Sequence, residues 1–282
     1  MASARAALRK TSNVLFVGFC SVTTVVALGV LAAILYSLLR QGLGGLSVDI
    51  FTKSTPAAGS PGGLSNAIVG SLMICALAML MAVVVGILAG TWLAEYAGDS
   101  WYAKVVRFLN DMLLSAPSIL VGLVVYYFMV AHLIHHFSGY AGAVALALIA
   151  VPVVTRTTED VLKLQPAALR ESGVALGAPV WTTVRKIMWR AAAGGLVTGG
   201  LLAFARISGE TAPLMFTALN NQFFSLDMSH PMANLPQVIF NFALTAYEDL
   251  RRLAWVGALL IAAAVLAAQI VARIIIREQR RS

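Results

Sequence analysis

Six long apolar stretches constrain the fold of this chain more than any other feature of its sequence. They cover residues 14–39, 66–94, 112–131, 139–155, 191–214 and 253–273. A helix needs about 20 apolar residues to cross the hydrocarbon core of a bilayer, and each stretch reaches or approaches that length. Backbone groups in lipid must pair within helices or a closed barrel, and runs of this length exclude the barrel. We therefore expect an all-α membrane protein with six transmembrane helices.

The composition agrees with a membrane protein. Of the 282 residues, 60% are hydrophobic and 11% are charged, whereas a soluble domain carries about 25% charged residues. The first apolar stretch is far longer than the roughly 7–15-residue core of a signal peptide, so we expect it to be retained as a helix. The predicted organisation is a cytoplasmic N-terminal tail, residues 1–13, followed by one membrane domain, residues 14–282.

The distribution of basic residues predicts the orientation. Four basic residues fall in the loops on one side of the predicted bundle, namely Arg40, Lys53, Arg251 and Arg252. Most of the others fall in the N-terminal tail, the C-terminal tail and the loops of the opposite side. Because basic residues concentrate in cytoplasmic loops, both termini are expected in the cytoplasm. The net charge of +8 is thereby explained by topology, and no nucleic-acid partner is expected.

Three connections are long enough to fold: residues 41–65 and 217–252 outside, and residues 156–190 inside. In the internal loop, Pro166 suits the first turn of a helix, where its missing N–H costs nothing. Gly177 can take the left-handed conformation that ends a helix, and Pro179 can open the next one. The pattern predicts a helix–glycine–helix element that projects into the cytoplasm. The alternative is an amphipathic helix that lies on the lipid surface.

The spacing in this loop resembles the EAA loop of ABC-importer permeases. The residues that carry the resemblance are Glu171, Ser172, Gly173, Gly177 and Ile187. The Leu-Pro pair that follows in that family is replaced here by Trp189 and Arg190. The resemblance implies a helix that docks in a groove of an ATPase subunit. We assign this coupling role to Glu171, Ala175, Leu176, Gly177 and Ile187.

The chain lacks the Gly-x-x-x-x-Gly-Lys-Ser/Thr pattern that cradles nucleotide phosphates. We therefore expect no cofactor bound by this chain and no enzymatic activity of its own. ATP and its magnesium ion would be bound by a partner subunit.

Two charges interrupt the fifth apolar stretch. Arg206 and Glu210 are four residues apart, so on a continuous helix they would share a face and could pair. An arginine inside a membrane is costly and usually faces a cavity or a partner. Its guanidinium matches the geometry of an oxyanion, and Ser208 and Thr211 add hydroxyl groups nearby. The site is predicted to be a path for an anionic substrate, with a purely structural ion pair as the alternative.

Other polar residues near the predicted helix ends are weaker candidates. Arg156, at the end of the fourth stretch, is a second path candidate, although it could also be an anchor that extends to the membrane interface. Asn110 and Asp111 are predicted to cap the third helix and form a hinge. His132 and His136 have a spacing that could bind a metal ion, but a solvated helix end is the simpler interpretation, and no metal site is expected.

Several runs closely resemble the PstA-type permeases of phosphate-specific ABC importers. They are FLNDMLLSAPSI at 108–119, RTTE at 156–159, ARISGETAPL at 205–214, FTALNNQF at 216–223 and NLP at 234–236. The resemblance implies a six-helix type I importer permease with MetI-like architecture in a bacterial cytoplasmic membrane. It further implies inorganic phosphate as the cargo, and it favours Arg206, Glu210 and Arg156 as path residues.

The same resemblance implies the partners: a homologous PstC-like permease subunit, a dimer of PstB-like ATPases and an extracytoplasmic phosphate-binding protein. Three alternatives stay open at this point. One is an ABC permease for another oxyanion, such as sulfate, molybdate or phosphonate. The second is a secondary transporter or channel that works without ATP, and the third is a membrane sensor.

Overall fold

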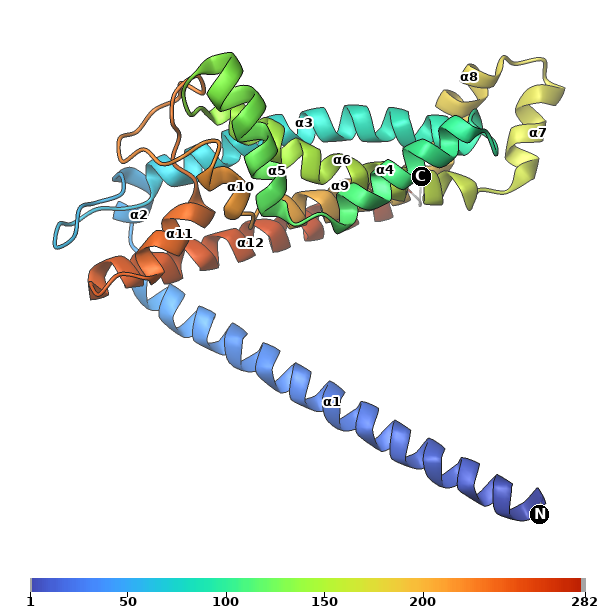
Figure 1. Ribbon diagram of the computed structural model, residues 1–282, viewed down its shortest axis with the longest axis horizontal. Helices are drawn as coiled ribbons and strands as arrows, with labels where there is room; N and C mark the ends of the chain where they lie inside the picture. The colour runs from blue at the N-terminus through green and yellow to red at the C-terminus, as the bar shows by residue number, and fades with distance from the viewer. Residues whose placement is uncertain (1, 280–282) are drawn as a thin grey trace.

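The computed structural model describes residues 2–279, and within that range it consists of helices and connecting loops (Figure 1). The elements are α1 (Ala2–Gly45), α2 (Asp49–Thr52), α3 (Ser65–Glu95), α4 (Trp101–Ser115), α5 (Ser118–Val125), the π-helix η1 (Tyr126–Ile134), α6 (Gly139–Lys163), α7 (Ala167–Ala175), α8 (Val180–Thr183), the π-helix η2 (Val184–Met188), α9 (Trp189–Ile207), α10 (Ala212–Met215), α11 (Leu235–Ala243) and α12 (Glu248–Gln279).

Five of these helical segments are long and apolar enough to cross a membrane, and a sixth span results if the bent pair of α4 with α5 and η1 is counted as one. The prediction of an all-α membrane protein is confirmed, and the six predicted spans agree with the structure when the bent pair is counted as one span. Figure 1 shows α3, α6, α9 and α12 side by side, with α7 and α8 at one end of the bundle and α2, α10 and α11 at the other. We call these the α7 end and the α11 end.

The third predicted span is broken rather than straight. Residues 101–115 and 118–134 form two helices that meet at an angle of 106°. The break follows from Pro117, because proline disfavours helical geometry in the residue before it. Ala116 is accordingly extended, with φ −67° and ψ 136°. The predicted single helix at residues 112–131 is therefore wrong in its start and in its continuity.

The core lies between α3 and α6, and a stripe of small residues in α3 makes it possible. The buried positions in this stripe recur every four residues: Ile74, Ala78, Ala82, Gly86 and Gly90. Residues four apart share a helix face, so the stripe presents one narrow, flat surface to α6. A Cβ atom added at Gly86 would lie only 2.6 Å from Cβ of Val154. The two backbones consequently pack at very short range.

Helix α9 packs against α6 in the same manner. A Cβ atom at Gly199 would lie 2.6 Å from Cγ2 of Thr157, and Gly195 faces Val161 just as closely. The pairs Gly86/Gly90 and Gly195/Gly199 are therefore both positions where helices pack closely.

Helix α1 contrasts with this packing. Its side chains from residue 12 to residue 41 are exposed or half-buried, and its main contact is with α12. The two helices meet near the α11 end, where Gly42 faces Leu259 and Gly45 faces Val256. From there α1 diverges from the bundle, and its N-terminal end lies toward the same side of the molecule as α7 (Figure 1).

Neutral hydrogen bonds close the α11 end. The Asn66 side chain of α3 accepts from the backbone N–H of Thr55 at 3.0 Å and donates to the carbonyl of Asn221 at 2.8 Å. Ser71 Oγ accepts from the N–H of Leu235 at 2.7 Å. Asn234 caps α11 by accepting from the N–H of Gln237. These bonds attach the loops around α2, α10 and α11 to α3.

Candidate functional site

A helical hairpin projects at the α7 end. Helix α7 ends two residues before Gly177, whose φ of +70° is readily accessible only to glycine. The N–H of Ala178 bonds to the carbonyl of Gly173, and the N–H of Gly177 bonds to that of Val174. This pair of bonds is a Schellman motif, which fixes the direction in which the chain leaves a helix. The predicted helix–glycine–helix element is confirmed, and α8 begins after Pro179 as expected.

The inner face of the hairpin is tightly packed, and its outer face is open. A Cβ atom at Gly173 would lie 2.5 Å from Cγ2 of Thr183, so α7 and α8 are in direct contact. On the outside, Leu176 is 85% exposed and Val174 is 63% exposed. Glu171, Ala175 and Gly177 are exposed as well. An apolar tip held on a rigid hairpin is suited to docking into another protein.

The fifth coupling candidate lies apart from the other four. Ile187 is half-buried in η2, between the buried side chains of Val184 and Met188. Helix α6 extends to Lys163, and the segment from Val180 leads through α8 and η2 directly into α9. The predicted loop of residues 156–190 includes the C-terminal part of α6 and the first residues of α9, because the helices continue beyond the apolar stretches that define them in the sequence.

An ion pair anchors the base of the hairpin to α3. Arg170 in α7 donates from Nε to Oε2 of Glu95 and from Nη2 to Oε1, both at 2.8 Å. Arg170 also donates to the carbonyls of Leu162 and Gln165, so it joins three helical segments. The Glu95 side chain is only 5% exposed. The hydrogen bonds to Glu95 raise the pKa of the Arg170 guanidinium, which keeps that group charged.

A second buried carboxylate joins α4 to α6. Glu159 in α6 is 3% exposed, and its Oε1 accepts from Arg107 Nε at 2.7 Å and from Lys163 Nζ at 2.5 Å. Arg107 also donates to the carbonyl of Leu93 in α3. Such charge-assisted bonds are about twice as strong as neutral ones. Together with the Arg170 pair, they connect α3, α4, α6 and α7 through two buried carboxylates.

The predicted anion-path residues lie where α9 ends. Helix α9 stops at Ile207, so Arg206 is in its last turn and Glu210 lies in the turn that follows. The predicted continuous helix of residues 191–214 is therefore wrong. Among the ion pairs of the described residues, none joins Arg206 to Glu210. The expected pairing fails because the two residues no longer share a helix face.

The side chains in this turn differ in exposure. Arg206 is exposed, whereas Ser208, Glu210 and Thr211 are half-buried. Ser208 Oγ donates to the carbonyl of Phe204 at 2.6 Å, and Thr211 precedes α10. A guanidinium that is exposed on a membrane-spanning chain needs a partner, water or an anion to compensate its charge.

Arg156 lies inside α6 rather than at its end. It pairs with Asp160 at 3.2 Å and with Asp111 of α4 at 3.7 Å, and it is about half exposed. Helices α6 and α9 are antiparallel, and Gly199 packs against Thr157. Arg206 is seven residues beyond Gly199, so it lies about 10 Å further along the bundle. Arg156 and Arg206 therefore lie at different positions along the axis of the bundle.

The structure also locates the weaker candidates, Asn110 and the two histidines His132 and His136. Asn110 does not cap a helix, because it is buried within α4 and donates from Nδ2 to the carbonyl of Pro152 at 3.2 Å. His132 lies in η1 with Nδ1 2.7 Å from the carbonyl of Tyr127, and His136 lies beyond the end of η1. Within residues 2–279, no cluster of three His, Cys, Asp or Glu side chains could hold a metal ion.

Comparison with known proteins identifies the family. The model of the "binding-protein-dependent transport system inner membrane component" matches residues 82–281. The chain is 49% identical to the phosphate transport system permease protein PstA of Haemophilus influenzae, over 96% of each chain. This chain belongs to the PstA permease family. The PstA protein of Pasteurella multocida is also 49% identical, over 94% of this chain and 95% of that protein.

Solved structures support the same architecture. A chain of the MetNI methionine ABC transporter in inward-facing conformations matches with a TM-score of 0.65, covering 76% of this chain and 94% of that chain. A second crystal form gives a TM-score of 0.64. The sequence identities are 20% and 19%, so the likeness concerns the fold alone. The MetI-like architecture expected for a PstA-type permease is confirmed.

Sequence reasoning missed Glu95, Glu159 and Arg107. Glu159 stands in the RTTE run but was passed over for Arg156, and Glu95 directly follows the second apolar stretch. A usable signal was the four-residue spacing of Glu159 and Lys163, which places both on one face of α6. The pairing of Glu95 with Arg170, 75 residues away in sequence, left no such signal.

Proposed function

We propose that this chain is the permease subunit of an ATP-driven importer that carries inorganic phosphate across a bacterial cytoplasmic membrane. The observation that carries the proposal is its 49% identity, over nearly the whole of both chains, to a phosphate transport permease. The distribution of basic residues supports an orientation with the α7 end and both termini in the cytoplasm.

The proposed assembly contains this chain, a homologous PstC-like permease, a dimer of PstB-like ATPases and a phosphate-binding protein outside. The binding protein would deliver phosphate at the α11 end. ATP and magnesium would be bound by the ATPases, because this chain has no phosphate-cradling loop of its own. Alternating access would then arise from movement of the two permeases relative to each other.

The α7–α8 hairpin supplies the proposed coupling. Its exposed tip, with Val174 and Leu176, would dock into the ATPase, and Glu171 would add a charged contact beside it. The Schellman motif at Gly177 and the close approach of Gly173 to Thr183 make the hairpin rigid. The Arg170–Glu95 pair connects that rigid body to α3, so a displacement of the tip would also move the core helices.

The turn between α9 and α10 supplies the proposed phosphate path. Arg206 is exposed on this chain and would face the space shared with the second permease. Its guanidinium would donate to the phosphate oxygens, with the hydroxyls of Ser208 and Thr211 adding neutral donors. Glu210 could accept a proton from hydrogen phosphate, which fully ionised sulfate could not offer. Arg156 would act at a second level of the path, nearer the α7 end.

Phosphate uptake is the direct test. Radiolabelled phosphate uptake is measured in cells that lack this chain and other phosphate systems, with and without the chain restored. We expect restoration to rescue uptake and excess sulfate to leave it unchanged. If excess sulfate lowered phosphate uptake, we would conclude that the importer carries another oxyanion. If uptake persisted after ATP hydrolysis was abolished in the partner, ATP-driven import would be excluded.

Arg206 can be tested within the same assay. Arg206→Gln is expected to abolish uptake while the assembled complex still hydrolyses ATP, and Arg206→Lys should retain part of the uptake because it keeps the charge. Arg273→Gln, which removes an exposed arginine at the far end of α12, is the matched control. Uptake by Arg206→Gln equal to that of the control would assign Arg206 a structural role only.

A further inference from the structure

The short helix α10 packs directly against α5. It follows the turn of residues 208–211, which holds most of the proposed phosphate path, and it lies beside α5 in Figure 1. A Cβ atom added at Gly122 of α5 would lie 2.6 Å from Cα of Pro213, the second residue of α10. Because this nearest atom belongs to the backbone, it cannot rotate away as the end of a side chain could. A side chain at Gly122 would therefore displace one helix relative to the other.

The chain just after α10 is fixed to other elements. Thr217 is fully buried, its Oγ1 donates to the carbonyl of Pro213 at 2.7 Å, and its own carbonyl accepts from the N–H of Ser138 at 3.0 Å. The carbonyl of Ala218 accepts from the N–H of Met232, also at 3.0 Å. The end of this segment farther from the path is thus held by backbone hydrogen bonds to the start of α6 and to the loop before α11.

The residues of the proposed path have few contacts of their own. Arg206 and Gly209 are exposed, and a Cβ atom added at Gly209 would have no neighbour within 4 Å. Among the described residues, neither Arg206 nor Glu210 forms an ion pair. Ile207 is fully buried in the core, which fixes the start of the turn. The position of the turn is therefore set by Ile207 on one side and by α10 on the other.

Helix α5 is not continuous with the helix before it. The extended residue Ala116 separates it from α4, and the two segments meet at an angle of 106°. Helix α4 is attached to α6 through the pair of Arg107 with Glu159. A break of this kind can act as a hinge, so α5 can change its angle while α4 stays attached to α6. Any such change reaches Pro213 through the close contact with α5.

We propose that Gly122 and Pro213 are positioning residues for phosphate transport. The lack of a side chain at Gly122 lets α5 pack against α10 closely enough to place Arg206, Glu210 and Thr211 along the path. Because the far end of the α10 segment is fixed, a shift of α5 displaces the end next to the path. The inference rests on the proposed function, and it adds to it two residues that do not touch phosphate themselves.

The ratio of ATP hydrolysed to phosphate transported tests the proposal. The assembled transporter is reconstituted in liposomes, and both rates are measured per assembled complex. Gly122→Ala should lower phosphate uptake on the order of tenfold while ATP hydrolysis continues, since a misplacement of about 1 Å is enough to lose hydrogen bonds to the anion. A role in folding alone would lower the amount of assembled complex and leave this ratio unchanged.

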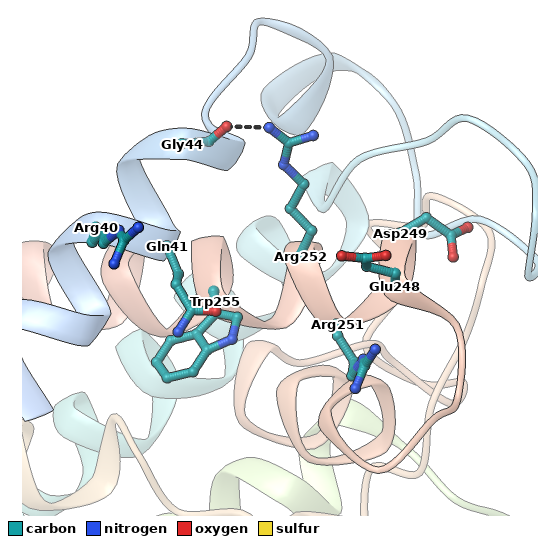
Figure 2. A pocket seen from close by; sticks show the side chains of 8 residues that line it. All are labelled: Arg40, Gln41, Gly44, Glu248, Asp249, Arg251, Arg252 and Trp255. Carbon is teal, nitrogen blue, oxygen red and sulfur yellow. Dashed lines mark hydrogen bonds between the residues drawn. The ribbon is translucent and has the colours of Figure 1, made fainter.

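Gly44→Ala is the matched control at the same end of the molecule. Gly44 lies near the end of α1 beside a cavity of about 740 Å³, and no atom lies within 4 Å of an added Cβ. Figure 2 shows that the carbonyl of Gly44 accepts a hydrogen bond from Arg252, which an alanine would retain. The control should therefore keep the ratio of the unmodified transporter.

A second variant keeps the test independent of whether Gly122→Ala folds. Pro117→Ala removes the residue that enforces the break, so α4 and α5 can straighten and α5 leaves its present contact with α10. This variant should also raise the ratio of ATP hydrolysed to phosphate transported. An unchanged ratio in both variants would overturn the inference. A transporter that carries no phosphate even with the unmodified chain would instead contradict the proposed function.

Discussion

The two ends of the bundle are held together by different chemistry. At the α7 end, the buried groups are carboxylates, Glu95 and Glu159, each paired with basic side chains from another helix. At the α11 end, the buried polar groups are the neutral amides and hydroxyls around Asn66, Asn234 and Ser71. A buried charge needs its partner at all times, whereas a neutral amide can exchange a protein partner for water at lower cost. The α7 end should therefore move as a rigid body and the α11 end should rearrange more easily.

The largest effect is expected from Arg170→Ala. It leaves Glu95 buried without its partner, and breaking a buried ion pair costs about 3–5 kcal/mol. The free energy of unfolding in mixed detergent micelles measures the loss. Glu95→Gln combined with Arg170→Gln should be less destabilising than Arg170→Ala, because no charge remains buried. A loss below that of the α11-end variant Asn66→Ala would contradict the comparison.

Gly90→Ala tests the close packing of α3 against α6 in the bundle that connects the two ends. An added Cβ would lie 2.5 Å from the carbonyl oxygen of Thr155, so α3 and α6 must separate. Overpacking of this kind costs about 2 kcal/mol. The matched control is Gly200→Ala in α9, where no atom lies within 4 Å of the new Cβ and helix propensity should rise slightly. Equal unfolding free energies for the two variants would mean that the close approach is not required.

Asn66→Ala tests the neutral hydrogen bonds at the α11 end. It removes an acceptor for the N–H of Thr55 and a donor for the carbonyl of Asn221. Leaving such groups unpaired costs about 1–2 kcal/mol, less than the charged case because water can replace part of the bonding. Hydrogen exchange should show faster exchange in the loops around α2 and α11 and unchanged exchange in α7. Faster exchange at the α7 end would show that the two ends are not independent.

The smallest change in stability is expected from Gly177→Ala. Its φ of +70° costs an alanine about 1 kcal/mol, and no atom lies within 4 Å of the added Cβ. If the hairpin must be rigid to couple, ATP-dependent uptake should fall by more than the small change in stability explains. Gly200→Ala, at a glycine in α9 that also has open space but lacks a positive φ, is the control.

Local features of this fold were predictable from sequence, and long-range ones were not. The apolar stretches predicted the membrane spans, and Gly177 with Pro179 predicted the hairpin, because each depends on residues close in the chain. The predicted ends of α6 and α9 were wrong, since apolar composition indicates which residues lie in the membrane and not where a helix ends. The break at Ala116 had a readable cause in Pro117 that the apolar pattern concealed.

The candidate site divides in the same way. Four of the five coupling residues lie together on the hairpin, because one helix and its cap place them. The grouping of Arg206 with Glu210 assumed a continuous helix and failed where α9 ends. The pairing of Glu95 with Arg170 could not have been found, since only the tertiary fold brings the end of α3 next to a residue 75 positions further along the chain.

The sparse packing of α1 has a consequence for how the protein is made. During synthesis α1 enters the membrane before the other described helices, and α12, its main contact within the chain, is made after them. Until then α1 depends on its own hydrophobicity to remain inserted. The joint at Gly42 and Gly45 closes a loop of about 200 residues, the slowest kind of contact to form. Completion of this joint therefore requires that the chain has been translated and inserted as far as α12.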